Sequence, residues 1–92
     1  MINSFKHKGL EIFFKTENKK GIIPSHANKI GRMLDRLEGS IRPDDMNLPG
    51  YDYHALKGEE KGKWAVSVNG NWRIVFEFEG ENAIKVDYLD YH

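Results

Sequence analysis

The sequence contains no cysteine, and this absence excludes disulfide bonds and zinc sites built on thiolate ligands. It also has no run of the roughly 20 apolar residues that a membrane-spanning helix requires. Residues 1–4 lack the charged and then apolar pattern that begins a secretory signal peptide. These absences predict a cytoplasmic protein that does not associate with a membrane.

A net charge of one sign is also missing, because 14 basic residues balance 14 acidic ones. The charges are nevertheless uneven along the chain. Residues 1–32 carry seven lysines and arginines against two acids, whereas residues 33–60 carry three against seven. A basic first third is suited to local contact with a polyanion. The same lysines would also serve simply to solvate exposed faces, and the charge pattern does not decide between these two interpretations.

Length and composition indicate one domain over residues 1–92, with 39% hydrophobic residues to form a single core. A short edge strand is expected at residues 1–5. Apolar side chains spaced i, i+3 and i+4 over residues 10–14 predict a short helix. A second helix is expected to begin at Ser25, as the N-cap, and to end at Gly39.

After a loop that contains two prolines, the hydrophobic period changes from that of a helix to that of a strand. Four strands are expected, at residues 51–56, 64–68, 72–79 and 83–89. The connections are rich in glycine, and Asn69-Gly70-Asn71 is a strong signal for a hairpin turn. Two helices followed by an antiparallel meander place the chain in the α+β class.

Alternation along residues 72–79 assigns each side chain to one face of the expected sheet. Ile74 and Phe76 point toward the helices, so Arg73 lies on the opposite face, near the middle of the sheet. A rigid strand would hold the guanidinium there in a fixed position for an anion. An arginine that merely solvates an exposed face has the same spacing, and alternation alone favours that simpler interpretation.

Several ionisable side chains stand near the expected strands, at His54, Lys57, Arg73, Asp90, Tyr91 and His92. The four histidines lack the spacing of a zinc helix, and no catalytic nucleophile or phosphate loop is recognisable, so no metal or other cofactor is expected. The set suits cleavage of RNA through its own 2′-hydroxyl, which needs a base, an acid and cations around the phosphate. Each residue alone is more often a surface group; their combination indicates a nuclease.

The stretch YHALKGEEKGKWAVSVNGNWRIVFEF, followed by VDYLDYH, resembles the HigB toxins of the RelE/ParE superfamily. In that group a histidine and LKG precede two tryptophan-containing strands, and the sequence closes on DYH. The opening MINSFKHKGLEIFF is also similar to the start of these toxins, so the resemblance covers essentially the whole sequence. Ala55 departs from the pattern, since a proline often follows the histidine in that family.

The resemblance implies the RelE-like fold, with two N-terminal helices packed on a small, mainly antiparallel sheet. It further implies a toxin of a type II toxin–antitoxin system that cuts mRNA in the A site of the 70S ribosome without a cofactor. The expected partners are therefore the translating ribosome with its mRNA and a cognate HigA-like antitoxin.

Carried over by position, the family's active-site residues coincide with the six ionisable residues named above. His54 and His92 are the candidates for acid and base, with their assignment open. Lys57 and Arg73 would stabilise charge on the phosphate, and Tyr91 would orient the phosphate or stack on a base. Asp90 would fix a histidine tautomer or hold the end of the last strand, which keeps the neighbouring residues at the rim of the sheet.

A ParE-like inhibitor that binds DNA gyrase is the alternative function. The superfamily shares one fold between the two activities, and a fold alone does not establish a function. A pure binding protein has no need of His54 together with Tyr91 and His92, and their presence favours the nuclease. An inactive relative is a third possibility, less favoured because every matching ionisable position is filled.

Overall fold

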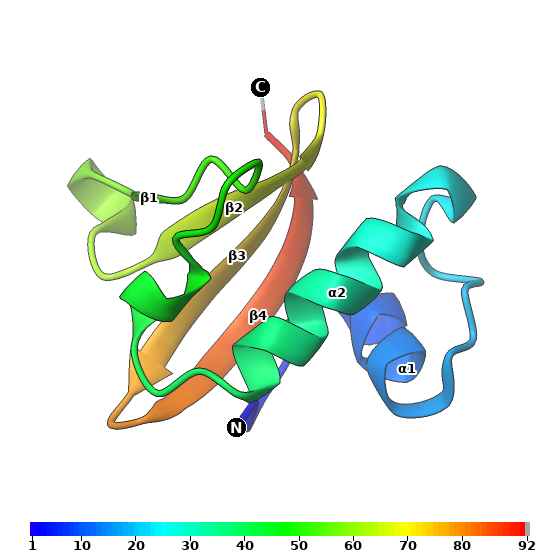
Figure 1. The fold of residues 1–92 in the computed structure, drawn as a ribbon, viewed down its shortest axis with the longest axis horizontal. Helices are drawn as coiled ribbons and strands as arrows, with labels where there is room; N and C mark the ends of the chain where they lie inside the picture. Colours follow the sequence, from blue (N-terminus) through cyan, green and yellow to red (C-terminus); the bar gives the residue numbers. More distant parts are fainter. Residues whose placement is uncertain (92) are drawn as a thin grey trace.

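The computed structural model describes residues 1–91, in which two helices lie on one side of a four-stranded antiparallel sheet (Figure 1). The helices are α1 (Lys8–Thr16) and α2 (Ala27–Glu38). The strands follow the order of the sequence across the sheet: β1 (His54–Ala55), β2 (Trp64–Asn69), β3 (Trp72–Glu79) and β4 (Asn82–Asp90). The predicted α+β arrangement is confirmed.

Short 3-10 turns interrupt the connections between these elements. They are η1 (Pro24–His26), η2 (Pro43–Met46) and η3 (Gly58–Glu60). The segment expected to be a plain loop, residues 40–50, therefore contains a turn of helix. Met46 at its end is fully buried and belongs to the hydrophobic core, so this connection contributes to packing.

The core lies between the helices and one face of the sheet. Helix α2 contributes Ile30, Leu34 and Leu37, which recur at helical spacing and are at most 1% exposed. Strand β3 contributes Ile74 and Phe76, both fully buried, as alternation predicts. Burial of such side chains stabilises the fold by about 1.5–3 kcal/mol each. The opposite face of the sheet is the one that the helices leave uncovered.

The first residues of the chain lie beside β4, but they do not form the predicted strand. Two isolated parallel bridges connect them to β4, Ile2 with Ala83 and Phe5 with Val86. Between the bridges, Lys85 adopts a left-handed φ of 53°, and its N–H donates to Ser4 Oγ instead of to a carbonyl. This conformation of Lys85 interrupts the regular backbone ladder on which a strand depends.

Two further sequence predictions need correction at their boundaries. Helix α2 begins after η1, with His26 rather than Ser25 at its N-cap position and no side-chain hydrogen bond there. Pro24 favours the tight first turn that moves the start of the helix along the chain. The strand predicted at residues 51–56 shrinks to His54–Ala55, because Asp52 has a left-handed φ of 48°.

The start of α1 and the α1–α2 connection touch at two glycines. A Cβ added at Gly21 would lie 2.4 Å from the Gly9 Cα. Real Cβ atoms essentially never come so close to another heavy atom. The variant Gly21→Ala should therefore force the two backbones apart and lower the free energy of unfolding by about 1–3 kcal/mol.

The matched control is Gly31→Ala, within α2. There a Cβ meets only the Phe13 ring, at an ordinary 3.9 Å, and the helix should gain up to about 1 kcal/mol from the better helix former. Urea unfolding followed by tryptophan fluorescence compares the two variants. Equal stabilities would contradict the close backbone contact.

Candidate active site

The pairing register places His54 and Arg73 on the same, uncovered face of the sheet. His54 is opposite Ala65, and Ala65 is opposite Val75 on β3. Directly paired residues share a face, and so do residues two apart on a strand, which brings Arg73 to the face of His54. The two residues are separated by two strand spacings, about 10 Å, and by two residues along β3.

Tyr91 joins this face from the end of β4. Its backbone N–H donates to the Asn71 carbonyl oxygen at 2.8 Å, which extends the β3–β4 pairing beyond Asp90. Its side chain lines a cleft of about 240 Å³ together with Val75 and Leu89 of the uncovered face. The backbone at residue 91 is thus held by the sheet. The cleft is lined by Leu89, which lies opposite Arg73, and by Val75 in the cross-strand row of His54, but not by His54 or Arg73 themselves.

The Arg73 guanidinium is held against the β2–β3 turn. Its Nη1 donates to the Gly70 carbonyl oxygen at 2.8 Å and to the Trp72 carbonyl oxygen at 3.2 Å. A guanidinium carries five N–H donors, so Nε and Nη2 retain the capacity to bind two oxygens of a phosphate. The side chain is half-buried, which limits the rotamers it can adopt.

Two other predicted residues, Lys57 and Asp90, lie apart from this group. Lys57 is exposed and precedes η3, beyond the end of β1. Asp90 is paired with Trp72, whose ring packs against the core, so alternation turns Asp90 toward the helical side of the sheet. His92 lies outside the described residues.

The cleft also contains charged residues that the sequence analysis did not select. They are Lys6, Glu60, Lys63, Glu77, Lys85 and Asp87. Lys63 Nζ and Glu60 Oε2 form an ion pair at 2.7 Å, and the hydrogen bond from Lys63 lowers the pKa of Glu60. The same hydrogen bond raises the pKa of Lys63. Residues 63, 65 and 67 alternate onto one face, and this spacing was the available signal for Lys63.

Comparison with known proteins assigns the family. Residues 3–92 match the family model described as the RelE-like toxin of type II toxin-antitoxin system HigB. The chain belongs to this family.

Two curated relatives align with the full length of this toxin. An endoribonuclease HigB from Proteus vulgaris is 36% identical over 92 residues, which cover all of both chains. A toxin HigB-1 from Vibrio cholerae serotype O1 is 32% identical over 94 residues, which cover all of this chain and 98% of the relative. The α+β arrangement agrees with the RelE-like fold, and membership of a type II system implies an antitoxin as partner.

Two of the toxin's histidines have structural roles. His7 Nδ1 accepts the Leu10 N–H at 2.9 Å and caps α1. His26 is 4% exposed, and its Nδ1 lies 2.7 Å from the hydroxyl of Tyr88, which is also buried. Burial raises the pKa of Tyr88, so the phenol is neutral at physiological pH. Of the described histidines, His54 is therefore the one available on the uncovered face.

The described residues contain neither a cluster of metal ligands nor a membrane-spanning helix. Among residues 1–91, no group of three or more carboxylates and imidazoles is arranged to hold a metal ion. Nor does any helix in this part of the chain have the length and apolar character needed to cross a membrane.

The buried His26–Tyr88 pair makes a testable contrast with the exposed His54. The variant His26→Ala leaves the Tyr88 hydroxyl without its imidazole partner and should lower the free energy of unfolding by about 1–3 kcal/mol. The variant His54→Ala removes an exposed side chain and should change the stability by no more than about 0.5 kcal/mol. Chemical denaturation of both variants checks the contrast, and similar losses would contradict these assignments.

Proposed function

We propose that this toxin is an endoribonuclease that cleaves mRNA on the translating ribosome, using the 2′-hydroxyl of the RNA as nucleophile. The proposal is supported by the Proteus vulgaris relative, which is named an endoribonuclease and aligns along the entire chain. It is supported equally by the chemistry of the uncovered face. Because translation takes place in the cytoplasm, the toxin would act there until its antitoxin binds it.

One observation carries the proposal: an imidazole, a guanidinium and a phenol are held on one face of a rigid sheet. His54 belongs to β1, Arg73 to β3, and Tyr91 follows β4. A sheet fixes such groups more precisely than a loop, and each is suited to a different part of phosphoryl transfer. The helices pack on the other face and leave this one free for a substrate to approach His54, which is exposed.

The proposed roles follow the chemistry of each side chain. His54 and His92 act as acid and base, and each proton transfer contributes about 10²–10⁴-fold to the rate. Arg73 stabilises the negative charge that builds up on the phosphate, with Lys57 as a second cation from beyond β1. Tyr91 orients the phosphate or stacks on a base.

Asp90 has a different role in this scheme. Its pairing with Trp72 turns its side chain away from the uncovered face. It therefore acts by holding the end of β4 in register with β3, which sets the position of Tyr91. This role is one of the two that the sequence allowed.

Removal of residues 91 and 92 separates chemistry from folding. The Tyr91 side chain is 38% exposed, and the loss of the last two residues should lower the free energy of unfolding by about 1 kcal/mol or less. Cleavage of mRNA should fall by about 10²–10⁴-fold, because a general acid or base is lost. Mapping of 5′ transcript ends after induction measures the cleavage, and thermal unfolding measures the stability.

The control is Glu81→Ala, an exposed residue in the β3–β4 turn, which should leave both quantities unchanged. Cleavage at the full rate by the shortened chain would contradict the mechanism. If the intact toxin instead broke DNA while transcripts stayed whole, gyrase inhibition would replace the proposed activity.

A further inference from the structure

The backbone before β1 contains an irregularity next to His54. If the His54–Ala65 register continued, Ser67 would pair with Asp52. The Ser67 N–H instead donates to the Tyr51 carbonyl oxygen at 2.7 Å. The register has therefore shifted by one residue, and Asp52 is the extra residue of a β-bulge.

The bulge depends on an unusual conformation of Asp52. Its φ of 48° lies in the left-handed region, which aspartate tolerates better than most residues but which still costs roughly 1 kcal/mol or more. Ser67 Oγ donates to Asp52 Oδ2 at 3.3 Å and links the bulge to β2. Bulges next to active sites commonly redirect a side chain.

The shift releases the Asp52 carbonyl from the β1–β2 ladder. That oxygen lies 2.8 Å from His54 Nδ1. A carbonyl oxygen only accepts hydrogen bonds, so Nδ1 must carry the proton. In a neutral imidazole the other nitrogen, Nε2, then has a free lone pair and can accept a proton.

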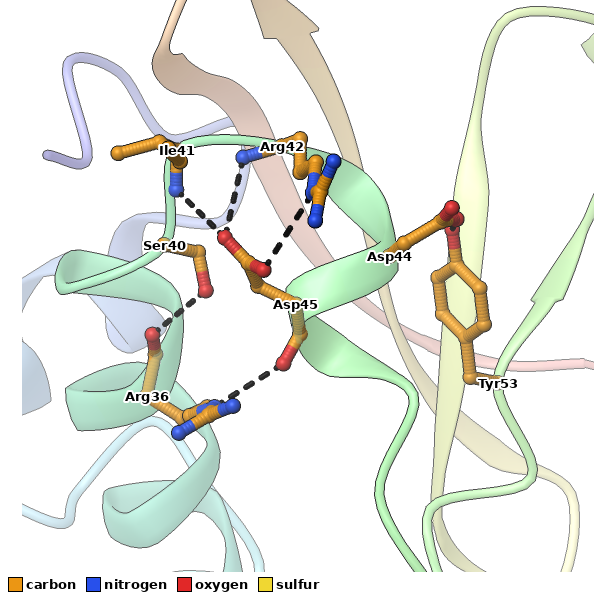
Figure 2. A network of polar contacts seen from close by, with 7 residues as sticks. All are labelled: Arg36, Ser40, Ile41, Arg42, Asp44, Asp45 and Tyr53. Atoms are coloured by element: carbon orange, nitrogen blue, oxygen red, sulfur yellow. Dashed lines mark hydrogen bonds and ion pairs between the residues drawn. The ribbon is translucent and has the colours of Figure 1, made fainter.

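A second anchor holds the chain between Asp52 and His54. The Tyr53 hydroxyl donates to Asp44 Oδ1 at 2.7 Å, as Figure 2 shows. Burial and this hydrogen bond raise the pKa of Tyr53 well above its usual range. The neighbouring Asp45 carbonyl oxygen accepts from Arg36 Nε at 3.0 Å, which ties η2 to α2 (Figure 2). The segment that carries His54 is therefore held both to β2, through Asp52, and to η2, through Tyr53. This is achieved without a proline at position 55.

We propose that Asp52 is a positioning residue, whose bulge holds His54 with the proton on Nδ1 and Nε2 as the accepting nitrogen. This inference rests on the proposed function and sharpens it, because it makes His54 the base and leaves His92 as the acid. His54 Nε2 takes the proton of the 2′-hydroxyl, and the 2′-oxygen bonds to phosphorus. The bond from phosphorus to the 5′-oxygen breaks, and the acid protonates that oxygen. The products are a 2′,3′-cyclic phosphate and a 5′-hydroxyl.

Nitrogen-15 NMR of the histidine side chains in the full chain tests the positioning directly. At a pH where His54 is neutral, the wild type should show the Nδ1–H form. The variant Asp52→Gly keeps the carbonyl and adopts the left-handed conformation easily, so it should show the same form. The variant Asp52→Val disfavours that conformation and should shift His54 toward the Nε2–H form, with mRNA cleavage reduced by up to about 10²-fold.

Unfolding curves check that each variant is folded, and Asp52→Ala replaces Asp52→Val if the latter is not. A wild-type His54 in the Nε2–H form would overturn the proposal. So would an Nδ1–H form that persists in a folded Asp52→Val or Asp52→Ala variant. If the predicted tautomers are observed while the wild type cuts no mRNA, the positioning is supported and the nuclease assignment fails.

Discussion

The pairing of β3 with strands on both of its sides is the constraint on which the rest of this toxin depends. Its inward residues, Ile74 and Phe76, are fully buried against the helices. Its outward residue Arg73 lies opposite Ser67 on β2 and Leu89 on β4. The hydrophobic core and the candidate site therefore share one strand, and a change that shifted its register would move Arg73 to the wrong face.

Alternation and turn chemistry were sufficient to predict the elements around this strand. The bounds of β3 and its inward residues were predicted correctly, because a half-buried strand imposes a period of two. The left-handed residues Asp52 and Lys85 were not predicted. Neither is a glycine, and their conformations arise from contacts with distant residues, Ser67 and Ser4. A local pattern cannot contain that information. The strand expected at residues 51–56 was therefore too long, and the one expected at residues 1–5 does not form.

The candidate site, like the fold, was predicted only in part from the sequence. Alternation predicted the face on which Arg73 lies. His54 and Tyr91 were selected as ionisable residues near the expected strands, and the family resemblance gave them roles. Sequence reasoning could not separate Asp90 from Tyr91, although one residue is enough to change the face of the sheet. The cations of the cleft come from three separate segments of the chain, as Lys6, Lys63 and Lys85. The uneven charge of the first third therefore contributes to this site through Lys6, and folding brings in the other two lysines.

The most direct test of the account asks whether the uncovered face is where RNA is cut. The variant Arg73→Lys keeps the charge but loses the planar fork of donors, and Arg32→Lys makes the same exchange on the exposed side of α2. Mapping of 5′ transcript ends after induction should show cleavage reduced by about 10²-fold for Arg73→Lys, and unchanged for Arg32→Lys. Cleavage at the wild-type level by a folded Arg73→Lys variant would contradict the assignment of the active site to this face.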